Sequence, residues 1–172
     1  MRKINLLVIH HSETGGGNVE FIRYCHTAKP PDGFGWNDVG YHFVIGNGKP
    51  NGGWKKSEDG KIEIGRPESA IGAHAKGFNS NSLGICLIGD FDKTNPTDNQ
   101  LCSLVKLLVE LCDAYGVDPL TQIKGHGELM PTLCPGANLQ RLMPIISDCV
   151  NNTMNGNNPI ISILKLVSKQ AT

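Results

Sequence analysis

Two histidines and one cysteine stand where the chain could carry out chemistry. His10 ends an apolar run that begins at Ile4, and His126 lies between glycines, eight positions before Cys134. Imidazole nitrogen and thiolate sulfur both bind zinc, and a catalytic zinc site uses three protein ligands with an open fourth position. These three side chains therefore offer a zinc-binding set, although their spacing alone also allows ordinary structural roles.

The elements around these residues decide which side chains can meet. Residues 4–10 are typical of a buried strand, and open α/β sheets place their sites at the carboxyl ends of such strands. His10 and His11 must point to opposite faces, because side chains alternate along a strand. Cys134 lies in a Cys-Pro-Gly loop without apolar periodicity, which distinguishes it from cysteines that simply pack in a core.

Apolar periodicity predicts one layered fold around a central sheet. Further strands are expected over residues 41–45, 61–64, 83–88 and 122–124. Helices are expected over residues 18–28, 97–115 and 139–150. Strands and helices in this order predict an α/β fold, with a central mixed β-sheet flanked by helices.

The 172 residues fit one compact domain. We expect this domain to occupy residues 1–150, followed by an Asn- and Gly-rich linker over residues 151–158. Residues 159–167 are apolar and predict a short helical tail. The tail could dock on the domain surface, or it could contact a membrane or a partner.

Net charge and hydropathy limit the classes of partner that the sequence leads us to expect. Lys+Arg and Asp+Glu are equal at 16 each, so the net charge gives no reason to expect a nucleic-acid partner. No apolar stretch approaches the ~20 residues of a membrane span, so stable membrane insertion is not expected. The apolar run after Met1-Arg2-Lys3 is too short for a signal peptide. We therefore expect synthesis in the cytoplasm and a separate route to any target outside it.

Several short motifs occur in a specific order along residues 8–135. They are Val8-Ile9-His10-His11-Ser12, the Gly-Trp-Asn-Asp-Val-Gly-Tyr-His-Phe run of residues 35–43, Gly65-Arg66-Pro67-Glu68, the Gly-Ala-His-Ala-Lys-Gly-Phe-Asn run of residues 72–79, Ser82-Leu83-Gly84-Ile85, Gly125-His126 and Cys134-Pro135. Through these motifs the chain resembles the zinc-dependent N-acetylmuramoyl-L-alanine amidases, a family that includes T7 lysozyme and the peptidoglycan recognition proteins. The resemblance implies the fold of that family.

The resemblance also implies roles for particular residues. His10, His126 and Cys134 match the zinc ligands of the family, so one Zn²⁺ is expected. Tyr41 matches a tyrosine whose hydroxyl lies near the metal-bound water. Thr132 stands where T7 lysozyme has a catalytic lysine and where many amidase-active peptidoglycan recognition proteins have threonine. A neutral donor would then take the place of a fixed cation at the oxyanion.

Four further residues are candidates for substrate binding. His74, Lys76 and Asn79 match a segment that lines the family's cleft, where they could hold peptide or sugar or form a polar turn. Arg66 could contact a substrate carboxylate or brace a loop.

The implied activity is zinc-dependent hydrolysis of the amide between N-acetylmuramic acid and the first L-alanine of the peptidoglycan stem peptide. Zinc lowers the pKa of its bound water from ~15.7 to ~7 and polarises the carbonyl, which suits this reaction. The chain resembles a phage or prophage endolysin that acts on the cell wall. The alternative is a bacterial enzyme that remodels or recycles the cell wall.

Two alternatives differ in chemistry. Some peptidoglycan recognition proteins bind the same ligand without cutting it, but those typically lack the cysteine that this chain has at position 134. A cysteine hydrolase would instead use Cys134 as a nucleophile beside His126 and would resist chelators. T7 lysozyme also binds its phage's RNA polymerase, but nothing in the present residues indicates that contact.

Overall fold

The computed structural model describes residues 2–157, in which each predicted strand belongs to one five-stranded sheet. The strands are β1 (Leu6–His11), β2 (Phe43–Asn47), β3 (Asp59–Ile64), β4 (Ser82–Leu87) and β5 (Ile123–Gly125). Their order in the sheet is β3-β2-β4-β1-β5. β3 runs antiparallel to its neighbour β2, and the other three pairings in the sheet are parallel. The predicted mixed sheet is therefore confirmed.

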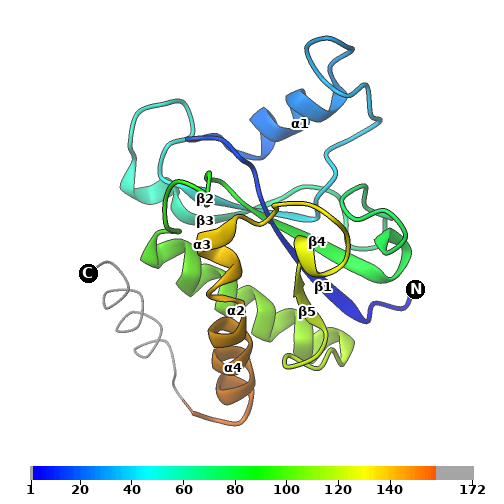
Figure 1. Cartoon of the computed structure of the whole chain (residues 1–172), viewed down its shortest axis with the longest axis vertical. Helices are drawn as coiled ribbons and strands as arrows, with labels where there is room; N and C mark the ends of the chain where they lie inside the picture. Colours follow the sequence, from blue (N-terminus) through cyan, green and yellow to red (C-terminus); the bar gives the residue numbers. More distant parts are fainter. Residues whose placement is uncertain (1, 158–172) are drawn as a thin grey trace.

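Helices cover both faces of this sheet (Figure 1). They are α1 (Val19–Thr27), α2 (Asp98–Tyr115), α3 (Ala137–Gln140) and α4 (Met143–Met154). Short 3₁₀ turns occur at Lys56–Glu58, Asn79–Asn81 and His126–Glu128. Helices α2 and α4 lie on one face, whereas α1 lies on the opposite face with the long loops.

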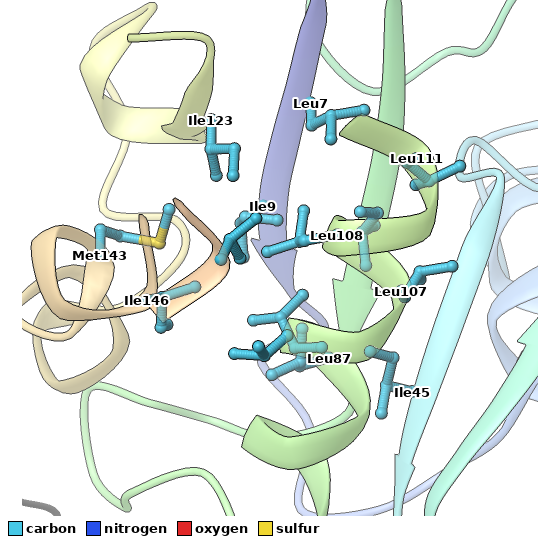
Figure 2. Packing of buried hydrophobic residues seen from close by; sticks show 14 of the residues in the cluster. Leu7, Ile9, Ile45, Leu87, Leu107, Leu108, Leu111, Ile123, Met143 and Ile146 are labelled. Atoms are coloured by element: carbon cyan, nitrogen blue, oxygen red, sulfur yellow. The ribbon is translucent and has the colours of Figure 1, made fainter. Parts of the chain in front are cut away.

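The central strand β1 is buried on both faces, and its alternation assigns each side chain to one of them. Leu7 and Ile9 join the main core with α2 and α4, as Figure 2 shows. Leu6 and Val8 point the other way and pack with Ala75. By the same alternation, the next residue after Ile9, His10, faces the side of the sheet that α1 covers. The side chains of His10 and His11 therefore lie on opposite faces of the sheet.

Helix α2 begins and ends at strong local signals. Thr97 and Gln100 form a capping box, in which the Thr97 hydroxyl accepts from the Gln100 backbone and Gln100 accepts from the Thr97 backbone. Gly116 ends the helix in the left-handed conformation, with φ at 65°. Between these caps, Leu101, Leu104 and Leu108 are fully buried against the sheet.

The C-terminal part of the prediction needs correction. The helix expected over residues 139–150 is two helices, α3 and α4, and Pro144 stands in the first turn of α4. The linker predicted from residue 151 is also wrong at its start, because α4 continues to Met154. Asn151 and Asn152 lie within this helix, and an Asn lowers helix stability by only a few tenths of a kcal/mol relative to other polar residues. The buried side chains of Cys149 and Val150 hold the preceding turn of α4 against the core.

The predicted tail at residues 159–167 lies outside the described residues. Within residues 2–157, no helix combines the length and the apolar character that crossing a membrane requires.

Candidate functional site

The three predicted metal ligands meet at one edge of the sheet. His10 lies at the carboxyl end of β1, and His126 directly follows the neighbouring parallel strand β5. The ring centroids of the two histidines are 4.5 Å apart. Cys134 reaches them from the loop that precedes α3. Parallel strands end at the same edge of a sheet, which explains how two histidines 116 positions apart come together.

The loop that carries Cys134 is held by backbone hydrogen bonds. The amide of Gly127 donates to the Cys134 carbonyl at 2.7 Å, and the Gly136 amide donates to the Leu133 carbonyl at 2.7 Å. Gly136 has φ at 87°, and a Cβ there would stand 2.6 Å from the carbonyl carbon of Phe91. Only glycine fits this position, which explains the Cys-Pro-Gly sequence. The His11 amide also faces the Cys134 sulfur at 3.5 Å.

The donor atoms fit a zinc ion. One ligand atom from each of His10, His126 and Cys134 lies within 4.8 Å of the others. Bonds of ~2.05 Å to nitrogen and ~2.3 Å to sulfur at a tetrahedral angle place two donors about 3.6 Å apart. His10 Nδ1 and Cys134 Sγ are 3.6 Å apart. In addition, His126 Nε2 is buried and has no hydrogen-bond partner among the described residues.

The protonation states suit ligands of a cation. Burial, and then the neighbouring His74 and His126, lowers the pKa of His10 well below its ordinary value. Burial also lowers the pKa of His126. Both imidazoles are thus neutral at neutral pH, as metal binding requires. Burial raises the pKa of the Cys134 thiol to about 12, so this thiol becomes a thiolate at neutral pH only beside a cation.

The same arrangement weighs against Cys134 as a nucleophile. A catalytic cysteine needs a lowered pKa and a base within hydrogen-bond reach. Here burial raises the pKa of the Cys134 thiol to about 12, the opposite of what activates a nucleophilic cysteine.

A cleft of about 470 Å³ opens over the three ligands. Tyr41 and Thr132 both line it, where a bound substrate could reach them. The Thr132 hydroxyl accepts a hydrogen bond from the Cys134 amide at 3.3 Å, which leaves its own proton free. Burial, and then Cys86, raises the pKa of Tyr41 well above its ordinary value, so its phenol keeps its proton. Both side chains therefore keep a hydroxyl proton, and that of Thr132 is available to the cleft.

Several cleft residues were not singled out by the sequence. Glu13, His26, Phe34 and Asp92 also line the cleft. His26 accepts from the Gly40 amide through Nδ1 at 2.9 Å, and burial followed by nearby Arg66 lowers its pKa to about 4. Glu13 has φ at 57°, a left-handed conformation rare for a residue with a side chain. Glu13 and Asp92 belong to the loops that follow β1 and β4, a placement that no sequence periodicity reveals.

The four predicted substrate-binding residues do not line this cleft. Arg66 donates to the backbone carbonyls of Val39, Ile71 and Asp38. This is the loop-bracing role left open by the sequence. Asn79 accepts from two backbone amides, and His74 is buried behind His10.

Lys76 is exposed on the loop that follows β3, outside the cleft. Its contact with substrate stays a prediction.

Comparisons with known proteins agree with this geometry. The family model described as N-acetylmuramoyl-L-alanine amidase matches residues 1–137. The endolysin of Escherichia phage T7 is 42% identical over 112 residues, which are 62% of this chain and 65% of that protein. The chain thus spans just under two thirds of the length of this curated relative. Peptidoglycan-recognition protein LB of Drosophila melanogaster is 39% identical over 110 residues, 61% of this chain and 40% of that protein.

Solved structures share the fold. The N-acetylmuramoyl-L-alanine amidase LysC from Clostridium intestinale superposes with a TM-score of 0.72 at 30% identity, over 87% of each chain. The ectodomain complex of peptidoglycan recognition proteins LCa and LCx, solved with tracheal cytotoxin, gives a TM-score of 0.68 at 28% identity. That match covers 83% of this chain and 82% of the other.

Proposed function

Since the chain belongs to the N-acetylmuramoyl-L-alanine amidase family, we propose that it is a zinc-dependent hydrolase of peptidoglycan, of the phage or prophage endolysin type. The bond cut is the amide between N-acetylmuramic acid and the L-alanine of the stem peptide. The observation that carries this proposal is the His10, His126 and Cys134 cluster on the floor of a 470 Å³ cleft.

The residues would divide the work as follows. Nδ1 of His10, one ring nitrogen of His126 and the Cys134 sulfur would hold one zinc ion. Zinc in such a site supplies a hydrolytic nucleophile at neutral pH and polarises the scissile carbonyl. Thr132 and Tyr41 would donate hydrogen bonds to the carbonyl oxygen as negative charge develops on it. Thr132 accepts from the Cys134 amide and so keeps its own proton for this role, whereas the Tyr41 phenol keeps its proton but also lies beside Cys86.

Peptidoglycan as the substrate is supported by the relatives. The phage relatives are endolysins, and one structural neighbour, the LCa and LCx ectodomain complex, was solved with tracheal cytotoxin bound. The cell wall is accordingly the proposed site of action. A non-catalytic recognition module is the second candidate, because several relatives are recognition proteins. The presence of Cys134 favours catalysis, since recognition proteins that bind without cutting typically lack this cysteine.

The test is hydrolysis of purified muropeptide, followed by mass spectrometry. We expect free stem peptide to appear, to stop appearing on chelation and to return when zinc is added back. The matched control is Cys134→Ala, which removes one ligand and leaves the other two. It should lower zinc affinity by more than the ~100-fold that loss of an outer partner can cost, and it should abolish cleavage.

The other outcomes are equally informative. Cleavage that persists under chelation but is lost on thiol alkylation would replace the zinc proposal with the cysteine mechanism. A zinc-loaded protein that binds muropeptide without cutting it would be a recognition module.

A further inference from the structure

A second histidine stands directly behind the proposed ligand His10. His10 Nε2 and His74 Nδ1 are 3.1 Å apart, and both side chains are buried, with exposed fractions of 1% and 8%. The two rings meet edge to face, with centroids 5.1 Å apart and planes at 86°. His10 therefore has its two nitrogens assigned to different tasks, because Nδ1 faces the Cys134 sulfur and Nε2 faces His74.

The direction of each hydrogen bond follows from one carbonyl group. The Phe78 carbonyl can only accept, so the Ser82 hydroxyl donates to it at 2.7 Å. The Ser82 oxygen is then the acceptor for His74 Nε2, which lies 3.4 Å away. A neutral imidazole carries one proton, so His74 Nδ1 has a lone pair and accepts from His10 Nε2. His10 Nδ1 is left with a free lone pair on the metal side.

The fold makes specific room for His74. A Cβ on Gly84 would stand 2.5 Å from Cγ of the His74 ring, and a Cβ on Gly72 would stand 2.6 Å from its Cδ2. The Asn79 side chain accepts from the backbone amides of His74 and Ala75 at 2.9 and 2.8 Å. Two sequence motifs, residues 72–79 and 82–85, thus serve to hold one imidazole in place.

We propose that His74, oriented by Ser82, is a positioning residue that keeps His10 in the tautomer whose Nδ1 binds zinc. Without an acceptor at Nε2, His10 would either move its proton to Nδ1 and block the metal, or bind the metal with a buried N–H left unpaired. Ligating histidines commonly give their second N–H to a carboxylate, a backbone carbonyl or a water, and here the neutral imidazole of His74 would take that place. This inference rests on the proposed zinc function and assigns His74 a role other than substrate binding.

Two variants separate positioning from packing. His74→Leu fills the space but accepts no hydrogen bond. His74→Asn places its Oδ1 near the position of the imidazole Nδ1, so it restores the acceptor. A third variant, Ile146→Val, removes one methyl group from the distant core around α4 and controls for a loss of stability alone.

The first readout is the tautomer of His10 in the metal-free protein, from ¹⁵N chemical shifts of labelled histidine. We expect the Nε2–H form in the wild type and in His74→Asn, and a mixture of tautomers in His74→Leu. A wild-type protein with its proton on Nδ1 of His10 would overturn the proposal.

The second readout is the zinc dissociation constant, from competition with a chromophoric chelator. His74→Leu should bind zinc about 10- to 100-fold more weakly, whereas His74→Asn should recover most of the affinity and Ile146→Val should match the wild type. Equal affinity in the wild type and His74→Leu would refute the positioning role, and so would equal weakening in all three variants. If the wild type binds zinc but leaves muropeptide uncut, the proposed function fails and the positioning role stands.

Discussion

At the scale of single residues, the cleft separates the proposed metal ligands from the proposed hydrogen-bond donors. The ligands are buried or half-buried and neutral, whereas Thr132 is exposed at the rim beside the cysteine. Its hydroxyl has one fixed partner, the Cys134 amide, which positions the oxygen and leaves the proton to point elsewhere. A side chain held in this way needs little reorganisation to meet a developing oxyanion.

Replacing this hydroxyl should slow the chemical step. We expect Thr132→Val to lower kcat by about 10- to 100-fold, because a hydrogen bond to a charged group contributes about 1.5–3 kcal/mol. KM and zinc affinity should change little, since valine keeps the shape of threonine. Thr132→Ser keeps the hydroxyl and should retain most of the activity. Steady-state kinetics on muropeptide would measure both variants, and an unchanged kcat in Thr132→Val would remove Thr132 from the mechanism.

The site residues differ in how far the sequence alone could predict them. That His10, His126 and Cys134 come together could be predicted, because residue type and motif order can be taken from the sequence itself. The roles of His74 and Arg66 could not, because their partners are distant in sequence. His10 and His74 are 64 positions apart, and Arg66 braces Val39, 27 positions away. Only the folded sheet shows which nitrogen meets which acceptor.

At the scale of elements, apolar periodicity in the sequence predicted each strand of the sheet, but backbone pairing between strands determines where each strand begins and ends. β1 includes His11 because its backbone continues to pair with β4 as far as Leu87, whatever the polarity of the side chain. Apolar periodicity does not report this pairing. In the same way, the sequence predicted one apolar helix where the structure has α3 and α4, because both helices bury leucine, methionine or isoleucine in the same core.

The junction of α2 with the sheet depends on one buried amide. Gln100 is fully buried, and its Nε2 donates to the carbonyls of Ile45 at 3.1 Å and Ile88 at 2.8 Å. Its Oε1 accepts from the Thr97 amide in the capping box. One side chain therefore caps the helix and also donates to a carbonyl of β2 and to a carbonyl just after β4.

Removing this amide should destabilise the whole fold. We expect Gln100→Leu to lower the free energy of unfolding by about 1–3 kcal/mol, because the Ile88 carbonyl and the Thr97 amide lose their partner in a buried setting. Urea denaturation of the metal-free protein would measure the change. Lys106→Ala, on the exposed face of the same helix, should stay within about 0.5 kcal/mol of wild type. An equally small effect of Gln100→Leu would show that water replaces the lost bonds.

At the scale of the whole molecule, the sheet joins early and late segments into one unit. The first strand supplies His10, and the loop after the last strand supplies His126 and Cys134. The family match ends at residue 137, yet α4 beyond it contributes Met143, Ile146 and Val150 to the main core. Helix α4 therefore packs with the rest of the fold as far as Val150, and its last turn runs to Met154.

The buried histidines should make the stability of this unit depend on pH. His42 is fully buried, accepts from the Gly84 amide through Nδ1 at 2.9 Å, and has its pKa lowered to about 4, chiefly by burial. In the unfolded chain its pKa returns to the ordinary value of about 6.5. Between these two values the unfolded state binds the proton and the folded state does not. Stability is thus complete above pH 6.5 and falls as the pH drops toward 4.

Comparison with one variant isolates the contribution of His42. Its share of the slope is at most about 1.4 kcal/mol per pH unit, and other buried histidines add to the total in the same direction. His42→Asn keeps an acceptor for the Gly84 amide but cannot bind a proton. We therefore expect a shallower fall in the free energy of unfolding for this variant between pH 7 and 5, measured by urea denaturation in the presence of a chelator. Identical slopes would mean that His42 is protonated in the folded protein, and the hydrogen bond from Gly84 would then have to break.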